Sequence, residues 1–344
     1  MPVPDVPGVR GVRVPRLLYV DWLRGLAVVF MIAWHTLDAW TILEDRTGFA
    51  FQVIIIIGGC AAPLFLFLAG VSVALAKATP KRGWQIFGLA HLFRLQSFFL
   101  NPWASWSSLL KPDILNILGL GMVATALCRA RATTLMRQVV WLLVPAAAIV
   151  LMAPASRLWA WPALLRPYVP RLEAYIRPIA GMGVFSIFPW LAFVFVGAFV
   201  GTVLARSGAS ARTQKWLAAA GTATIAAGTV GSYLPPATAS EFWSTSISFF
   251  LIRIGGMILG LPLAWMWLRS RSTGPMLVFG RASLFVYWVH VELAYGFFTY
   301  PLQRALPLGW ALVVFALFTA AMLGLAHLWI RRPRPIVPAY LRPS

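Results

Sequence analysis

Long apolar runs are the feature of this sequence that most restricts its fold. Ten can be marked along the 344 residues, most of them close to the roughly 20 residues that an α-helix needs to cross a bilayer. Hydrophobic residues make up 60% of the chain and charged residues 11%, whereas soluble domains carry about 25% charged residues. A soluble enzyme, a disordered chain and a disulfide scaffold are therefore excluded, and an all-α, polytopic membrane helix bundle is predicted. The expected spans are 18–42, 51–76, 85–100, 112–128, 138–154, 179–205, 216–234, 244–267, 276–299 and 309–330.

The basic residues predict the orientation of these spans, because Lys and Arg are concentrated in cytoplasmic loops. With the N-terminus inside, eighteen of the 29 basic residues fall on the inner side and seven on the outer side. We therefore expect both termini to be cytoplasmic, as basic tails at 1–17 and 331–344 around one transmembrane domain at 18–330. The same asymmetry accounts for the net charge of +20, so no nucleic-acid partner is expected. The segment 155–178 carries four of the outer arginines and is interpreted as an amphipathic stretch along the membrane interface.

The first expected helix carries four ionisable side chains, which are Asp21, Arg24, His35 and Asp38. Charged groups within a membrane helix are costly and indicate a functional site by default. At 100° per residue the four share an arc of about 100°, and Arg24 and His35 lie on one stripe about 16 Å apart along the axis. This arrangement suits a long anionic substrate with its charged head at Arg24 and its reactive end at His35. The other interpretation is an interfacial Asp21–Arg24 ion pair with His35 as a polar packing residue.

More polar residues are expected inside the bundle, where they are interpreted as lining a cavity for an acceptor. His91 and Arg94 share a face of the third helix, and Asp113 and Asn116 open the fourth. Asp113 also suits the start of a helix through its charge alone. Arg253, in the middle of the eighth helix, needs an anionic partner, either an acid of the chain or a phosphate of a ligand.

The ninth helix has Arg281 at its cytoplasmic end and His290 farther out. His290 is either a second acid–base group or a hydrogen-bonded core residue, and His327 on the last helix is interpreted as structural. The two cysteines lie in apolar runs, and neither a zinc ligand set nor a phosphate-binding glycine loop is recognisable, so no metal site is expected.

Several motifs resemble one enzyme superfamily. The run Asp21-Trp22-Leu23-Arg24-Gly25-Leu26-Ala27, with His35 eleven residues after the arginine, resembles the first helix of the transmembrane acyltransferase superfamily and the Arg–His spacing of its acyltransferase-3 branch. Four later segments resemble bacterial members of the heparan-α-glucosaminide N-acetyltransferase catalytic-domain family; they are 62–72, 113–120, 188–191 with Gly197, and 280–290. In the lysosomal branch an asparagine takes the place of His35, and the catalytic histidine lies in the next loop. That loop, 43–50, has no histidine here, so the role passes to His35 and glucosamine specificity is not carried over.

The resemblance implies an enzyme of the bacterial inner membrane that moves an acyl group, expected to be acetyl, from cytoplasmic acyl-CoA. The acceptor would be a hydroxyl or amine of a sugar, glycan or lipid-linked saccharide at the outer face. Acyl-CoA is the donor substrate, and no permanently bound cofactor is implied. Alternatives from other classes are a transporter or flippase for an anionic small molecule and a scaffold helix bundle.

The same resemblance suggests roles for the polar residues. The phosphates of CoA would bind by charge-assisted hydrogen bonds near Asp21, at Arg24, Arg82 and Arg281. His35, oriented by Asp38 or another carboxylate, would act as the general base, with His290 as a second candidate. An acyl-histidine intermediate is the less favoured course.

Overall fold

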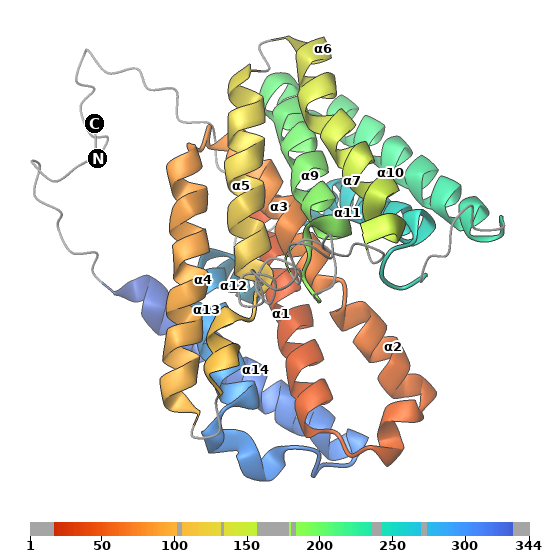
Figure 1. Cartoon of the computed structure of the whole chain (residues 1–344). Coiled ribbons are helices and arrows are strands. Elements are labelled where there is room, and N and C mark those ends of the chain that lie inside the picture. The colour runs from red at the N-terminus through yellow and green to blue at the C-terminus, as the bar shows by residue number, and fades with distance from the viewer. Residues whose placement is uncertain are drawn as a thin grey trace, which may run out of the picture.

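The computed structural model describes residues 17–101, 105–131, 134–156, 179, 184–234, 242–269 and 274–332, and these form a bundle of helices (Figure 1). The expected tails and the segment 155–178 lie almost entirely outside the described residues. The α-helices are α1 (Leu18–Trp40), α2 (Phe49–Gly58), α3 (Ala61–Leu75), α4 (Pro80–Leu100), α5 (Ile114–Arg131), α6 (Leu135–Gln138), α7 (Val144–Ser156), α9 (Ile187–Ser207), α10 (Ala211–Ser232), α11 (Ile247–Trp267), α12 (Pro275–Arg281), α13 (Ser283–Tyr295) and α14 (Leu308–Arg331).

Seven stretches of the described helices are long and apolar enough to cross a membrane. The pair α12 and α13 makes an eighth candidate span, bent by 89° between the two helices. The prediction of an all-α membrane protein is therefore confirmed. Helices α4 and α10 occupy the expected spans 85–100 and 216–234 and have the length of spans, but they are not among the stretches apolar enough to count as candidates. The seven are Leu18–Trp40, Phe49–Leu75, Ile114–Arg131, Leu135–Ser156, Ile187–Ser207, Ile247–Trp267 and Leu308–Arg331.

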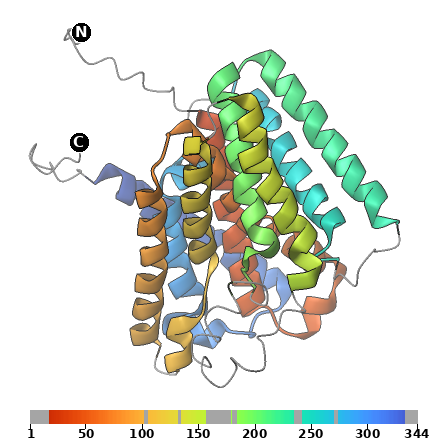
Figure 2. The ribbon, with the colours of Figure 1, turned by 45° about the horizontal axis from the view of Figure 1, so that its top comes forward.

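Helix α1 lies at the centre of the bundle, and the helices that it contacts most extensively are α2, α3, α11, α12, α13 and α14. Its apolar residues Ala27, Val28 and Ile32 are fully buried. By contrast, only 11% of the apolar stretch of α14 is buried inside the protein, so most of that helix is left for contact with lipid. Figure 2 shows α10 and α11 packed together at one edge of the molecule. On the polar stripe of α1, Asp21 is buried, whereas the side chains of Arg24 and Asp38 are partly exposed.

The bend between α12 and α13 differs from the single helix expected at 276–299. It allows α12 to pack on the first half of α1 while α13 continues along the second half. Two glycines make the first contact close, because a Cβ at Gly25 would lie 1.8 Å from the Met276 carbonyl oxygen and one at Gly280 would lie 1.9 Å from that of Asp21. Small residues of this kind let membrane helices approach each other closely. The bend therefore places residues of α13 beside His35.

Candidate functional site

A cavity of about 800 Å³ runs along the polar side of α1, within the size range of small-molecule sites. Of the twelve predicted site residues, four line it: Arg24, His35, Arg82 and Arg253. Its wall also includes polar side chains that the sequence interpretation did not assign a role, namely Gln52, Ser72 and Tyr287, and several aromatic rings, among them Trp34, Trp190 and Trp243. The cavity therefore joins the arginine and the histidine of the predicted stripe.

At one end of the cavity, the guanidinium group of Arg24 is held by two hydrogen bonds. Its Nη1 donates to Asp21 Oδ1 at 2.9 Å, and its Nη2 donates to Ser72 Oγ on α3 at 2.7 Å. Asp21 is buried, whereas the Arg24 side chain is 23% exposed. Because both ends of the fork are held while one face stays accessible, Arg24 is positioned to bind an anion in the cavity.

A second arginine, Arg82 near the start of α4, lines the same cavity and donates a hydrogen bond to Gln85 Oε1 at 3.4 Å. It therefore supports the predicted cationic site. The structure does not place Arg281 at this site, because Arg281 is exposed at the C-terminal end of α12 and does not line the cavity. Of the predicted donor-binding residues, the structure brings together Asp21, Arg24 and Arg82.

Farther along α1, His35 faces a second histidine from α13. The Nε2 atom of His290 lies 3.2 Å from the Nδ1 atom of His35, and the two rings lie nearly parallel, with an interplanar angle of 24° and centroids 5.0 Å apart. His290 is fully buried, and its Nδ1 atom lies 2.8 Å from the carbonyl oxygen of Val286. Two of the three predicted catalytic residues are thus in direct contact, although they are 255 positions apart in the sequence.

The third predicted catalytic residue, Asp38, is directed elsewhere. Its carboxylate forms an ion pair with Arg46 and accepts a hydrogen bond from the Tyr295 hydroxyl at 3.3 Å. Among the described residues, neither Asp38 nor another carboxylate is hydrogen-bonded to His35. The His290 imidazole contacts His35 at the position where a carboxylate was expected. The ring of Tyr295 lies against the His35 ring, with centroids 5.4 Å apart.

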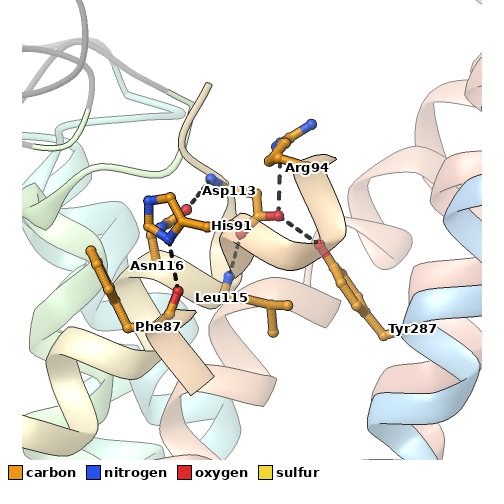
Figure 3. A network of polar contacts seen from close by, with 7 residues as sticks. All are labelled: Phe87, His91, Arg94, Asp113, Leu115, Asn116 and Tyr287. Atoms are coloured by element: carbon orange, nitrogen blue, oxygen red, sulfur yellow. Dashed lines mark hydrogen bonds and ion pairs between the residues drawn. The ribbon is translucent and has the colours of Figure 1, made fainter. Parts of the chain in front are cut away.

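Three of the predicted acceptor residues, Arg94, Asp113 and Asn116, form a network next to the cavity, with His91 beside it (Figure 3). Asp113 Oδ2 lies 3.8 Å from Arg94 Nη2 and accepts a hydrogen bond from the Tyr287 hydroxyl at 3.4 Å. The backbone N–H of Asp113 donates to Asn116 Oδ1 at 2.9 Å, and Asp113 Oδ1 accepts from the Leu115 N–H at 2.9 Å. This local arrangement agrees with the expectation that Asp113 suits the start of a helix.

Within this network only Tyr287 and Leu115 line the cavity. The ring of Tyr287 also packs edge-on against His290, with centroids 6.0 Å apart. His91 lies at the margin, with its Nδ1 3.0 Å from the carbonyl oxygen of Phe87 on its own helix. Asp113, Asn116 and Arg94 therefore contact the cavity through Tyr287 rather than directly.

Arg253 lines the cavity from α11, and its guanidinium carbon lies 3.9 Å from the centroid of the Phe249 ring, a cation–π contact. Two acids that could have paired with Arg253 form ion pairs with other arginines: Asp113 with Arg94, and Asp38 with Arg46. In the part of the chain that the structure describes, no carboxylate forms an ion pair with Arg253. Its positive charge is therefore directed at the cavity and an aromatic face.

Ser72 and Tyr287 are two of the polar residues of the cavity wall that were not predicted as site residues. Ser72 ends the apolar run 62–72 as a lone hydroxyl within α3, and Tyr287 lies one turn before His290 on α13. In each case the available signal was a polar group within an apolar span. That signal does not reveal which helix the group faces.

Residues 16–234 match the family model described as heparan-alpha-glucosaminide N-acetyltransferase, catalytic. The matched region extends from α1 to α10 and so includes Arg24, His35 and Asp113, whereas Arg253 and His290 follow it. No curated protein matches the chain at a significant level. The predicted resemblance to this family is confirmed, while the resemblance to the acyltransferase-3 branch stays a prediction.

Proposed function

The chain belongs to the family of heparan-alpha-glucosaminide N-acetyltransferase catalytic domains, and from this membership we propose that it transfers an acetyl group across a membrane. The donor is acetyl-CoA in the cytoplasm, and the acceptor is a hydroxyl or amine of a sugar, glycan or lipid-linked saccharide at the outer face. The family membership supports an acetyltransferase-type enzyme, and the apolar helices support an integral membrane protein. We place it in the inner membrane of a bacterium.

The proposed topology has ten spans with both termini in the cytoplasm. It adds α4 and α10 to the eight candidate spans, and it treats 18–330 as one domain between two basic tails. Basic residues follow the positive-inside rule in this arrangement. They occur at the α3–α4 connection, at the end of α5, at the α9–α10 connection and at the ends of α11 and α14; examples are Lys81, Arg129, Arg212, Arg269 and Arg331. The α1–α2 connection lies on the opposite side.

In this orientation Arg24 and Arg82 are at the cytoplasmic end of the cavity, where they bind the phosphates of the CoA group. Arg24 is oriented for this role by Asp21 and Ser72. Arg281 is exposed near the same end and contributes long-range electrostatic attraction rather than a direct contact. The acyl end of the donor then extends along α1 toward His35, because Arg24 and His35 are about 16 Å apart along the helix axis.

His35 acts as the general base in the proposed reaction. It takes the proton from the acceptor O–H or N–H as that atom bonds to the thioester carbonyl carbon. The C–S bond then breaks, and the proton passes from His35 to the departing CoA thiolate. Asp38 supports this site by holding Tyr295 and Arg46 beside it. Direct transfer of this kind needs no acyl-histidine intermediate.

The acceptor is held by groups around the outer half of the cavity. Arg253 and the aromatic rings of Trp34 and Trp243 line that wall. Tyr287 adds a hydroxyl that is oriented by Asp113, which is in turn held by Arg94 and Asn116. His91 supports the same region from α4.

The observation that carries the proposal is that a single cavity is lined by both Arg24 and His35. The test is to incubate the purified protein in liposomes with labelled acetyl-CoA and a panel of amino sugars, hydroxyl sugars and extracted envelope glycans. We expect release of the CoA thiol together with a labelled acceptor. Tight binding of acetyl-CoA without thioester cleavage on any acceptor would contradict the proposal.

A further inference from the structure

Three of the four histidines in the chain make the same local contact. The Nδ1 atoms of His91, His290 and His327 lie 3.0, 2.8 and 3.0 Å from the carbonyl oxygen four residues earlier on the same helix. A carbonyl oxygen only accepts hydrogen bonds, so each of these Nδ1 atoms must carry a hydrogen. His35 differs, because its Nδ1 atom instead meets Nε2 of His290 at 3.2 Å.

When both imidazoles are neutral, the donor and the acceptor of the His35–His290 hydrogen bond can be identified. A neutral imidazole carries one N–H, and in His290 that N–H is Nδ1–H, which donates to Val286. The Nε2 atom of His290 therefore has a lone pair and accepts. It follows that His35 donates through Nδ1–H and keeps its own lone pair on Nε2. No partner for that Nε2 atom occurs among the residues that the structure describes, and His35 lines the cavity.

Burial supports the neutral form of His290. The residue is fully buried, and its described contacts are the backbone of Val286 and of Tyr287, the His35 ring and the edge of the Tyr287 ring. None of these is a carboxylate. An imidazolium ion there would be a buried charge with no counter-ion, which is costly.

We propose that His290 is a positioning residue that selects the Nδ1–H tautomer of His35 and so presents the basic Nε2 atom of His35 to the cavity. This inference rests on the proposed function, in which His35 is the general base. When His35 takes a proton on Nε2, its Nδ1–H bond to His290 strengthens, because the donor is then charged. In hydrolase triads a carboxylate holds the equivalent nitrogen of the catalytic histidine. Here a second, neutral imidazole does so.

The direct test is nitrogen NMR of the ring atoms in protein labelled with ¹⁵N-histidine, because the chain has only four histidines to assign. We expect His35 to show a protonated Nδ1 and an unprotonated Nε2 in the wild-type protein. The His290→Phe variant keeps an aromatic ring but has no acceptor, so His35 should lose its preference for Nδ1–H. The matched control is His327→Phe, which loses the same helix carbonyl contact and should leave the His35 signals unchanged.

A wild-type spectrum in which His35 carries its hydrogen on Nε2 would overturn the proposal, and this measurement does not depend on the folding of any variant. Unchanged His35 signals in a folded His290→Phe protein would also overturn it. Neither result depends on enzyme activity.

The kinetic test separates positioning from a merely structural role. We expect His290→Phe to lower kcat by about 10–100-fold, the range known for partners that orient metal-ligating histidines, with little change in KM for acetyl-CoA. The His290→Gln variant should recover part of the loss, because its amide oxygen can accept from His35 Nδ1–H. Equal activity of the Phe and Gln variants would contradict the tautomer role.

The two proposals fail in different ways. Full transfer by a His35→Ala protein would remove the general base from the proposed function, while the NMR assignment would still hold. Transfer that requires His35, combined with a hydrogen on its Nε2 atom, would overturn only the role of His290.

Discussion

Arg24 on α1 and Ser72 on α3 are joined by a hydrogen bond of 2.7 Å from Nη2 to Oγ. The Ser72 hydroxyl donates in turn to the Leu68 carbonyl oxygen at 2.6 Å, so its lone pairs face the arginine. With Asp21 on the other arm of the fork, the guanidinium group has a fixed orientation at the end of the cavity. In the proposed function this orientation decides how the donor enters.

The first prediction concerns donor binding. Arg24→Ala should raise the Kd for acetyl-CoA by about tenfold, because a hydrogen bond to a charged group is lost, and wild-type binding should weaken with added salt because the contact is ionic. Arg24→Lys should recover only part of the affinity, because a point charge does not reproduce the planar fork. Equilibrium binding of labelled acetyl-CoA measures both. The control is Arg212→Ala, which removes an exposed arginine at the start of α10.

The Arg281→Ala variant tests whether Arg281 contributes less to donor binding than Arg24 does. Because Arg281 does not line the cavity, its loss should weaken binding less than the loss of Arg24. Equal losses would contradict the donor site as described.

The second prediction concerns the close contact between α1 and α12. Gly280→Ala should destabilise the protein by about 1–3 kcal/mol, as overpacking does, because its Cβ would lie 1.9 Å from the backbone oxygen of Asp21. Thermal unfolding in detergent measures the effect. Gly256→Ala on α11 is the control, since a Cβ there meets nothing within 4 Å. Equal stability of the two variants would show that α12 does not pack this closely on α1.

The third prediction concerns Tyr287 and Asp113. Tyr287→Phe should raise KM for the acceptor and leave KM for acetyl-CoA nearly unchanged, because the lost hydroxyl lies away from the Arg24 end. Asp113→Asn should have a similar but smaller effect on KM for the acceptor, since it acts on the cavity through the group that orients that hydroxyl. In the double variant the two effects should not add, because the residues act through one contact. Full additivity would indicate that they act independently.

The fourth prediction concerns the topology. Reporter fusions after Arg82, Arg137, Lys215 and Ser344 should report the cytoplasm, and fusions after Asp45 and Ala239 should report the outer side. The physical basis is the excess of basic residues in the loops assigned to the inner side. A cytoplasmic signal after Asp45 would overturn the first hairpin and every assignment of side that follows from it.

The helical bundle could be predicted from the apolar runs, because a span of about 20 apolar residues has few other stable structures in lipid. Of the breaks within the runs, the one beside Gly58 and Gly59 has a signal in the sequence, because such glycines indicate close helix packing or a bend, whereas the one at Ala282 has none. The apolar stretch Phe49–Leu75 is divided at Gly59 and Cys60, and the ninth run bends at Ala282, a residue that does not itself break helices. These breaks arise from packing between helices, which hydropathy along one helix does not record.

For the candidate site too, contacts along one helix could be predicted from the sequence, whereas contacts between helices could not. Periodicity along α1 predicted that Arg24 and His35 share a stripe, and in the structure both line one cavity. The pairing of His35 with His290, and of Arg24 with Ser72, depends on how α13 and α3 pack against α1. Sequence reasoning expected a carboxylate to orient His35, but Arg46 and Tyr295 lie close enough to engage Asp38 instead. The spacing of residues within α1 does not reveal that Arg46 and Tyr295 compete with His35 for the Asp38 carboxylate.

The central claim is that His35 is the general base, and acetyl transfer by the His35→Ala protein tests it most directly. The assay uses protein in liposomes, with acetyl-CoA affinity measured on the same sample and His327→Ala as the matched control. Removal of a general base costs roughly 10²–10⁴-fold in rate. If His35 is the general base, the His35→Ala protein loses activity by that factor while acetyl-CoA affinity is retained and the control stays close to wild type. Near-wild-type turnover by His35→Ala would contradict this role of His35.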